Sequence, residues 1–174
     1  MRRAVLSGLV LALAAVQPVA AADRVTFGGS FTIRMSVPAD RALHLYDPVG
    51  ERAWAPDWSP QFMRDADAAS LPEGTVFTTR GHGDRPSVWV LQRYDRTAHE
   101  IAYTTYVPDT AVVTIRIAVH DRPAGASEAD VRYDLTSVSD EGDVFVRGFG
   151  EKFSHMQPHW QQAIDGALAR TSGG

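Results

Sequence analysis

The feature that most constrains the fold is a series of segments in which apolar and polar residues alternate with a period of two. Between residues 112 and 120, Val113, Ile115, Ile117 and Val119 alternate mainly with polar residues, and residues 129–137 repeat the pattern. Successive side chains of a strand point to opposite faces, so the pattern predicts strands with one buried and one solvated face. Strands of this kind form a sheet that is covered on one side only.

Short connections rich in Gly, Pro and Asp separate these segments, and such residues are typical of turns. Short links join antiparallel neighbours, so we expect an antiparallel meander. The predicted strands cover residues 25–37, 75–80, 87–94, 101–107, 112–120, 129–137 and 144–149.

Two short helices are predicted between the first strand and the second. Pro38 and Asp40 favour a helix start, and Asp47-Pro48 ends this helix. Residues 50–72 then form an irregular, aromatic-rich connector, within which residues 61–69 are the second predicted helix.

The C-terminal segment changes to a helical period. Its apolar residues recur at steps of three and four and form one stripe on a helix: Phe153, Met156, Trp160, Ile164, Ala167 and Leu168. Pro158 either kinks this helix or lies in its first turn. The pattern as a whole predicts an α+β fold, in which a curved antiparallel sheet of about seven strands wraps around a long C-terminal helix.

The first 22 residues have the pattern of a signal peptide. Arg2 and Arg3 precede an apolar run over residues 4–16, and small residues follow at 20–22. We therefore predict a leader over residues 1–22, one domain over 23–170 and a flexible tail over 171–174. The expected location is periplasmic or secreted, without a stable membrane anchor after cleavage.

Composition excludes several functions. The chain has no cysteine, so thiol catalysis, disulfides and Cys-based metal sites are excluded. Its net charge is −4 and it has no basic block, which makes nucleic acid an unexpected partner. Composition predicts no oligomeric state.

Several stretches resemble the START-like superfamily, also called SRPBCC or polyketide cyclase-like, and in particular a bacterial subgroup of it. They cover residues 50–60, 74–77, 88–90 together with 94–95, 136–142 and 153–160. The resemblance implies the helix-grip fold and a cavity between sheet and last helix that binds lipids, sterols, polyketides or other metabolites. A minority of the superfamily are cyclases or dehydratases, so the resemblance also leaves such an activity open for this chain.

Side chains on the inner faces of this fold are the candidates for lining such a cavity. Alternation and the helical stripe select Phe31, Ile33, Met35, Tyr103, Ile115, Ile117, Tyr133, Leu135, Met156 and Trp160, and the connector adds Trp54 and Trp58. The two tryptophans either line the cavity or seal it. Glu51 beside them is either a buried carboxyl with a raised pKa or a solvated group paired with Arg52.

No convergent catalytic or metal set is recognisable. His155 and His159 are four residues apart, but the glutamate of the zinc-protease pattern is missing, so we expect two solvated histidines and no metal. His82 lies in a turn without a nucleophile motif. We therefore expect binding of a small hydrophobic or amphipathic molecule without cofactor or covalent catalysis. The alternatives are a cyclase or dehydratase that uses Tyr103 or Tyr133 with His82 or Glu51, and a protein-interaction module that docks through the Trp54–Trp58 segment.

Overall fold

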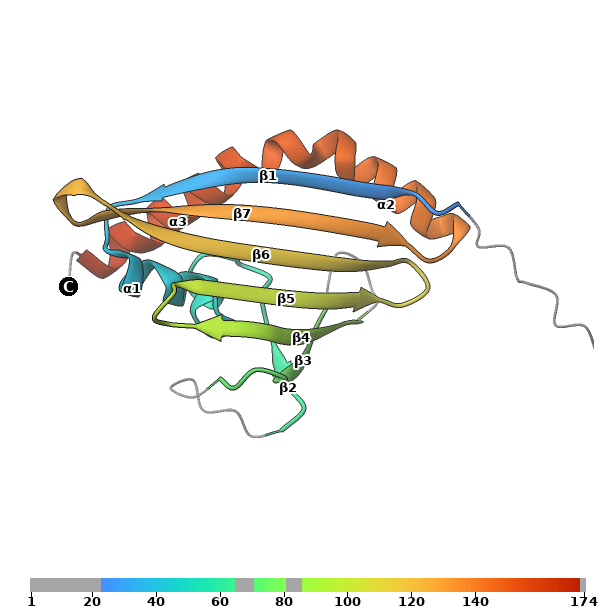
Figure 1. The fold of residues 1–174 in the computed structure, drawn as a ribbon, viewed down its shortest axis with the longest axis horizontal. Helices are drawn as coiled ribbons and strands as arrows, with labels where there is room; N and C mark the ends of the chain where they lie inside the picture. The colour runs from blue at the N-terminus through green and yellow to red at the C-terminus, as the bar shows by residue number, and fades with distance from the viewer. Residues whose placement is uncertain (1–22, 65–70, 81–85, 173–174) are drawn as a thin grey trace, which may run out of the picture.

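A computed structural model of the chain describes residues 23–64, 71–80 and 86–172. The predicted leader, residues 1–22, lies outside the described residues. Seven strands form one antiparallel sheet in the order β1-β7-β6-β5-β4-β3-β2 (Figure 1). The strands are β1 (Thr26–Met35), β2 (Gln61–Phe62), β3 (Val76–Arg80), β4 (Pro86–Asp95), β5 (Glu100–Val107), β6 (Ala111–Arg122) and β7 (Ala126–Ser137). The predicted meander is confirmed, and the first strand pairs with the last.

Strands β6 and β7 show the alternation on which the prediction was based. Ile115 lies opposite Tyr133, and Val113 opposite Leu135. All four are buried, whereas Arg116, next to Ile115, and Arg132, next to Tyr133, are exposed. The sheet therefore buries one face, as the period-two pattern predicts.

Helical segments lie along that face (Figure 1). After β1 come α1 (Ala39–Leu43) and the 3-10 turns η1 (His44–Tyr46) and η2 (Gly50–Ala53), and η3 (Pro123–Gly125) forms the turn between β6 and β7. After β7 come α2 (Asp140–Lys152), the 3-10 turn η4 (Phe153–His155) and α3 (Met156–Ser172). Because α2 packs on β1, β6 and β7 and α3 on β1, the helix-grip fold is confirmed.

The prediction of a strand over residues 144–149 is wrong, because these residues belong to α2. Ser139 caps the helix, and its hydroxyl oxygen accepts a hydrogen bond of 3.0 Å from the Gly142 backbone N–H. Asp140, Glu141 and Asp143 lie in the first turn, where acidic groups stabilise the helix dipole. These capping residues outweigh the strand preference of the valines and phenylalanines that follow.

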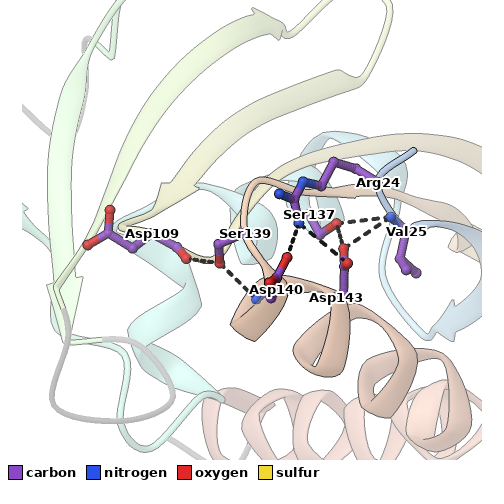
Figure 2. A network of polar contacts seen from close by, with 8 residues as sticks. Arg24, Val25, Asp109, Ser137, Ser139, Asp140 and Asp143 are labelled. Atoms are coloured by element: carbon purple, nitrogen blue, oxygen red, sulfur yellow. Dashed lines mark hydrogen bonds and ion pairs between the residues drawn. The ribbon is translucent and has the colours of Figure 1, made fainter. Parts of the chain in front are cut away.

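A polar network anchors the start of α2 to two other parts of the chain (Figure 2). The Ser139 hydroxyl donates to the Asp109 carbonyl, in the turn between β5 and β6. Asp143 accepts from the Ser137 hydroxyl and from the backbone N–H of Val25, which lies directly before β1. These two hydrogen bonds are the leading causes that lower the pKa of Asp143. Gly142 permits the close approach, since a Cβ there would lie 1.9 Å from the Thr110 carbonyl oxygen.

The connector and the last helix differ from the prediction in detail. Residues 61–64 are not helical, since Gln61 and Phe62 form β2 opposite Thr78 and Phe77, and residues 65–70 of the predicted helix lie outside the described part. Pro158 lies in the first turn of α3, which resolves the two alternatives for this residue. Helix α3 continues past residue 170 to Ser172. None of the described helices is long and apolar enough to cross a membrane.

Candidate ligand-binding site

Trp160, on the inner side of α3, is the centre of an aromatic cluster between helix and sheet. Its ring contacts Phe31 of β1 and Tyr133 of β7, with centroids 5.3 Å and 6.3 Å away. It also contacts Tyr46 of η1 at 6.4 Å and Trp54 of the connector at 4.8 Å. One side chain thus joins the final helix, the neighbouring strands β1 and β7 at one edge of the sheet, η1 and the connector.

The two tryptophans of the connector use their indole N–H groups within the protein. Trp54 Nε1 donates to the Leu45 carbonyl at 2.6 Å, and Trp58 Nε1 donates to the Pro48 carbonyl at 2.8 Å. Neither N–H is therefore free to orient a ligand. Trp54 is buried and Trp58 half-buried, so the two rings do not form the exposed aromatic patch that a docking surface needs.

Trp58 lies in a second aromatic cluster, at the β2 to β4 side of the sheet. Its ring contacts Phe77 at 5.9 Å and Trp89 at 5.2 Å, both edge to face. Phe77 and Trp89 in turn contact Tyr103 of β5. Trp58 therefore covers this part of the sheet, while Trp54 packs against the helix.

The buried carboxylate of Asp47 holds the beginning of the connector in place. It accepts hydrogen bonds from the backbone N–H groups of Val49, at 2.9 Å, and Gly50, at 2.7 Å. The Tyr94 hydroxyl donates to it at 3.0 Å, and His44 Nδ1 contacts the same oxygen. Burial, followed by the charge of Asp47, raises the pKa of Tyr94 to about 12. A buried charge with four partners satisfies the rule that such groups are paired and hydrogen-bonded.

Glu51, in η2, is a half-buried acidic residue near the buried Asp47. Its surroundings desolvate the carboxyl and raise its pKa well above the ordinary value, and the negative charge of Asp47 adds to this shift. Part of its surface nevertheless stays accessible. Among the described residues, no hydrogen bond or ion pair to the Glu51 carboxyl is found. Glu51 is thus half-buried, with a raised pKa and no ion pair to Arg52.

Three tyrosines from different elements lie within the electrostatic range of Glu51. Burial raises the pKa of Tyr46, Tyr103 and Tyr133, and the charge of Glu51 is the second cause for each of them. The Tyr103 hydroxyl donates to the Tyr46 carbonyl at 2.9 Å, and the Tyr46 hydroxyl donates to Met35 Sδ at 3.5 Å. Within the described part of the chain, the Tyr133 hydroxyl has no hydrogen-bond partner.

The structure brings some of the predicted lining residues together around Trp160 and places others elsewhere on the inner face. Phe31, Trp54 and Tyr133 contact Trp160 directly. Trp58 belongs to the second cluster. The remaining candidates lie in the core or pack against it: Ile33, Met35, Tyr103, Ile115, Ile117, Leu135 and Met156.

The histidines that the sequence singled out, His155 and His159, lie outside this arrangement. His82 lies outside the described residues. His155 and His159 are exposed, and the described residues contain no group of three or more His, Cys, Asp or Glu that could hold a metal ion. The Tyr103 hydroxyl already donates to a backbone carbonyl. Of the residues named for the cyclase hypothesis, Tyr133 and Glu51 are therefore the remaining candidates.

Sequence reasoning missed Tyr46, Asp47, Phe77 and Trp89. It also left the role of Glu51 open. One local signal was available for Glu51: Trp54 lies three residues further on, a spacing that places both on one side of a 3-10 turn. In the structure, the backbone N–H of Trp54 donates a hydrogen bond of 3.2 Å to the backbone carbonyl of Glu51.

No protein-family model matches the sequence, and no curated protein matches it. Solved structures do match. Ara h 8.0201 is similar with a TM-score of 0.59 and 13% identity, over 83% of this chain and 99% of that chain. The ZhuI aromatase/cyclase from Streptomyces sp. R1128 is similar with a TM-score of 0.60 and 15% identity, over 84% and 96%.

A third similar structure is norcoclaurine synthase from Thalictrum flavum in complex with dopamine and hydroxybenzaldehyde. Its TM-score is 0.60 at 12% identity, over 84% of this chain and 88% of that chain. At such identities the similarity shows the fold alone. The chain thus has the helix-grip fold of these structures, and the fold that the sequence resemblance implies is confirmed.

Proposed function

We propose that the protein binds a small hydrophobic or amphipathic molecule between the sheet and α3, in the periplasm or outside the cell, without a covalent step. The observation that carries the proposal is the convergence of rings from β1, η1, β7 and the connector on Trp160. Aromatic surfaces with a few polar groups are typical of small-molecule sites. Glu51 and Tyr133 are the polar groups here.

The environment of Glu51 supports an enclosed site. Its side chain keeps accessible surface although the protein around it desolvates the carboxyl. A group that faces a hollow inside the protein has both properties, whereas a group in open solvent keeps its ordinary pKa. The similar structures support the proposal as well, since two of them are a cyclase and a synthase, the latter in complex with small aromatic molecules. The exported location rests on the pattern of the first 22 residues.

The test is native mass spectrometry and solvent extraction of the protein purified from its own compartment, combined with titration of an apolar fluorescent dye. Ala163 of α3 packs against the core, whereas Ala169 on the same helix is exposed. We expect Ala163→Phe to fill the site and abolish dye binding, and Ala169→Phe to leave it unchanged. Near-ultraviolet circular dichroism verifies that both variants are folded. Wild-type protein that carries no extractable molecule and binds no dye would overturn the proposal.

A further inference from the structure

The hydroxyl of Tyr133, on β7, differs from those of the other tyrosines. Each of the other four uses its hydroxyl in a hydrogen bond within the protein: Tyr46, Tyr94, Tyr103 and Tyr106. Only 6% of Tyr133 is exposed, yet among the described residues its hydroxyl has no hydrogen-bond partner. A buried hydroxyl normally has one, because it has given up its hydrogen bonds to water.

The indole of Trp160, on α3, is the same exception among the tryptophans. The other three donate their N–H groups to oxygen atoms of the protein: Trp54, Trp58 and Trp89. In the residues that the structure describes, the N–H of the half-buried Trp160 has no acceptor. All five tyrosines and all four tryptophans lie in the described residues, so Tyr133 and Trp160 are the two exceptions in the whole chain.

The two unused donors belong to rings that contact each other. Tyr133 and Trp160 meet edge to face, with centroids 6.3 Å apart and planes at 74°. Side chains of a strand stand roughly perpendicular to the sheet, so the Tyr133 hydroxyl is directed away from β7 and towards the helical layer to which Trp160 belongs. One contact between sheet and helix thus contains both of the unused donors.

The other rings around Tyr133 hold it in place and are uncharged. The centroids of three of them lie 5.6–6.4 Å from that of Tyr133: Phe31 of β1, Phe149 of α2 and Phe153 of η4. Gly29 lies opposite Tyr133 in the register, and the Phe153 ring occupies the place of a side chain there, since a Cβ at Gly29 would lie 2.5 Å from Phe153 Cε1. Phenylalanine rings supply no ordinary acceptor for the hydroxyl and no charge to pair with an ionic ligand.

We infer that Tyr133 and Trp160 are the specificity-determining pair of the site and donate hydrogen bonds to a carbonyl oxygen of a neutral, otherwise apolar ligand. The inference rests on the proposed function, because it names the polar group that the ligand presents at the same site. A carbonyl oxygen has two lone pairs and can accept from both donors. A hydrocarbon leaves both donors unpaired, and a carboxylate brings a charge that the surrounding rings do not balance.

The first test is a double-mutant cycle between the Tyr133 hydroxyl and the ligand oxygen. Acetylnaphthalene and isopropenylnaphthalene, substituted at the same carbon, have nearly the same shape, but only the first has a carbonyl oxygen. Competition with the apolar fluorescent dye measures the affinity of each. The ratio of ketone to hydrocarbon affinity should be about fivefold or more higher in wild-type protein than in Tyr133→Phe. Equal ratios in the two proteins would overturn the inference.

Tyr103→Phe is the matched control, because the Tyr103 hydroxyl already donates to the Tyr46 carbonyl at 2.9 Å. This variant should lose stability and keep the wild-type affinity ratio. Tyr133→Phe should show the reverse, with stability unchanged or increased, since it removes a hydroxyl that has no partner among the described residues. A loss of stability as large as that of Tyr103→Phe would mean that the protein itself uses the Tyr133 hydroxyl, and the inference would fail.

Nuclear magnetic resonance of the indole N–H groups gives a second readout that needs no variant. The Trp160 signal should shift more with acetylnaphthalene than with isopropenylnaphthalene. The signals of Trp54, Trp58 and Trp89 should respond alike to both probes, because their N–H groups are bonded within the protein. A Trp160 signal that does not distinguish the probes would contradict the inference.

Two further outcomes count against the carbonyl ligand. Naphthoate, the anion of similar shape, should bind more weakly than acetylnaphthalene, and tighter binding would exclude a preference for a neutral molecule. Dye that neither naphthalene probe displaces would also overturn the inference. Wild-type protein that does not bind the dye at all contradicts the proposed function instead, so the two failures are distinguishable.

Discussion

The indole of Trp54 packs against the indole of Trp160, with ring centroids 4.8 Å apart and planes tilted by 57°. Trp54 comes from the irregular connector and Trp160 from α3, so the contact joins two parts of the chain that are distant in sequence. The Trp54 N–H bonds to the Leu45 carbonyl at the same time, which fixes the ring in position. The connector thereby becomes part of the packed core between the sheet and α3.

Removal of the Trp160 ring should destabilise the protein strongly. Trp160→Ala deletes contacts to four rings, and we expect a loss of about 3 kcal/mol in the free energy of unfolding. Urea denaturation followed by circular dichroism measures it. His159→Ala, at an exposed neighbouring position, should change stability by no more than about 0.5 kcal/mol. A similar small loss in both variants would contradict the central role of Trp160.

The hydrogen bond between Tyr94 and Asp47 should contribute measurably to stability. Tyr94→Phe removes a donor from a buried carboxylate, and we expect a cost of about 1.5–3 kcal/mol. Tyr106→Phe is the matched control, because Tyr106 is exposed and water can replace its hydroxyl. Chemical denaturation of both variants decides the point, and equal effects would argue against the interaction.

Glu51 should make the stability of the protein depend on pH in a defined direction. Its pKa is raised in the folded state, so both states are protonated below about pH 4.5, where it imposes no penalty. As the pH rises above this value, the unfolded chain ionises first. Folding stability then declines by up to about 1.4 kcal/mol per pH unit until the pKa of the folded state is reached.

Glu51→Gln removes this decline. We expect wild type and variant to differ least in acid and the variant to gain relative stability from weakly acidic to neutral pH. Urea denaturation across this range measures the difference, with Glu151→Gln as a variant that should follow wild type. A difference between Glu51→Gln and wild type that stays constant with pH would show that the carboxyl is solvated.

Loss of the cap should weaken the start of α2. Ser139→Ala removes the acceptor for the Gly142 N–H and the donor to the Asp109 carbonyl, at an expected cost of about 1–2 kcal/mol. Ser154→Ala serves for comparison, since Ser154 is exposed in η4. Hydrogen exchange of the α2 amides should accelerate in the first variant alone. Unchanged exchange there would mean that packing, and not the cap, fixes the helix.

The sheet could be predicted from sequence because each strand shows its burial locally. Ile115 and Tyr133 alternate with polar neighbours in their own strands, and no knowledge of the partner strand is needed to see it. Residues 144–149 misled the same reasoning, since valines and phenylalanines there also suit a strand. Ser139 and the acidic residues after it are typical of a helix start. The same stretch, with Gly142 between acidic residues, also suits a turn, and the turn was predicted.

The surroundings of Glu51 could not be predicted in the same way. The charge of Glu51, in η2, acts on Tyr103 of β5 and Tyr133 of β7, and no local period in the sequence encodes this proximity. A charged residue in an irregular segment is most often solvated. Only the tertiary arrangement distinguishes this carboxyl from the exposed acids elsewhere in the chain.

The pairing of β1 with β7 has a consequence for the order in which the chain acquires its structure. Thr26 lies opposite Thr136, so β1 has no partner until nearly all of the domain has been synthesised. Hairpins from β3 to β7 connect near neighbours and can form early, whereas closing a loop of this length costs entropy before its contacts repay it. The space around Trp160 needs β1, β7 and α3 together. Folding intermediates with the hairpins alone therefore expose the aromatic face, and the proposed binding site forms only in the last step of folding.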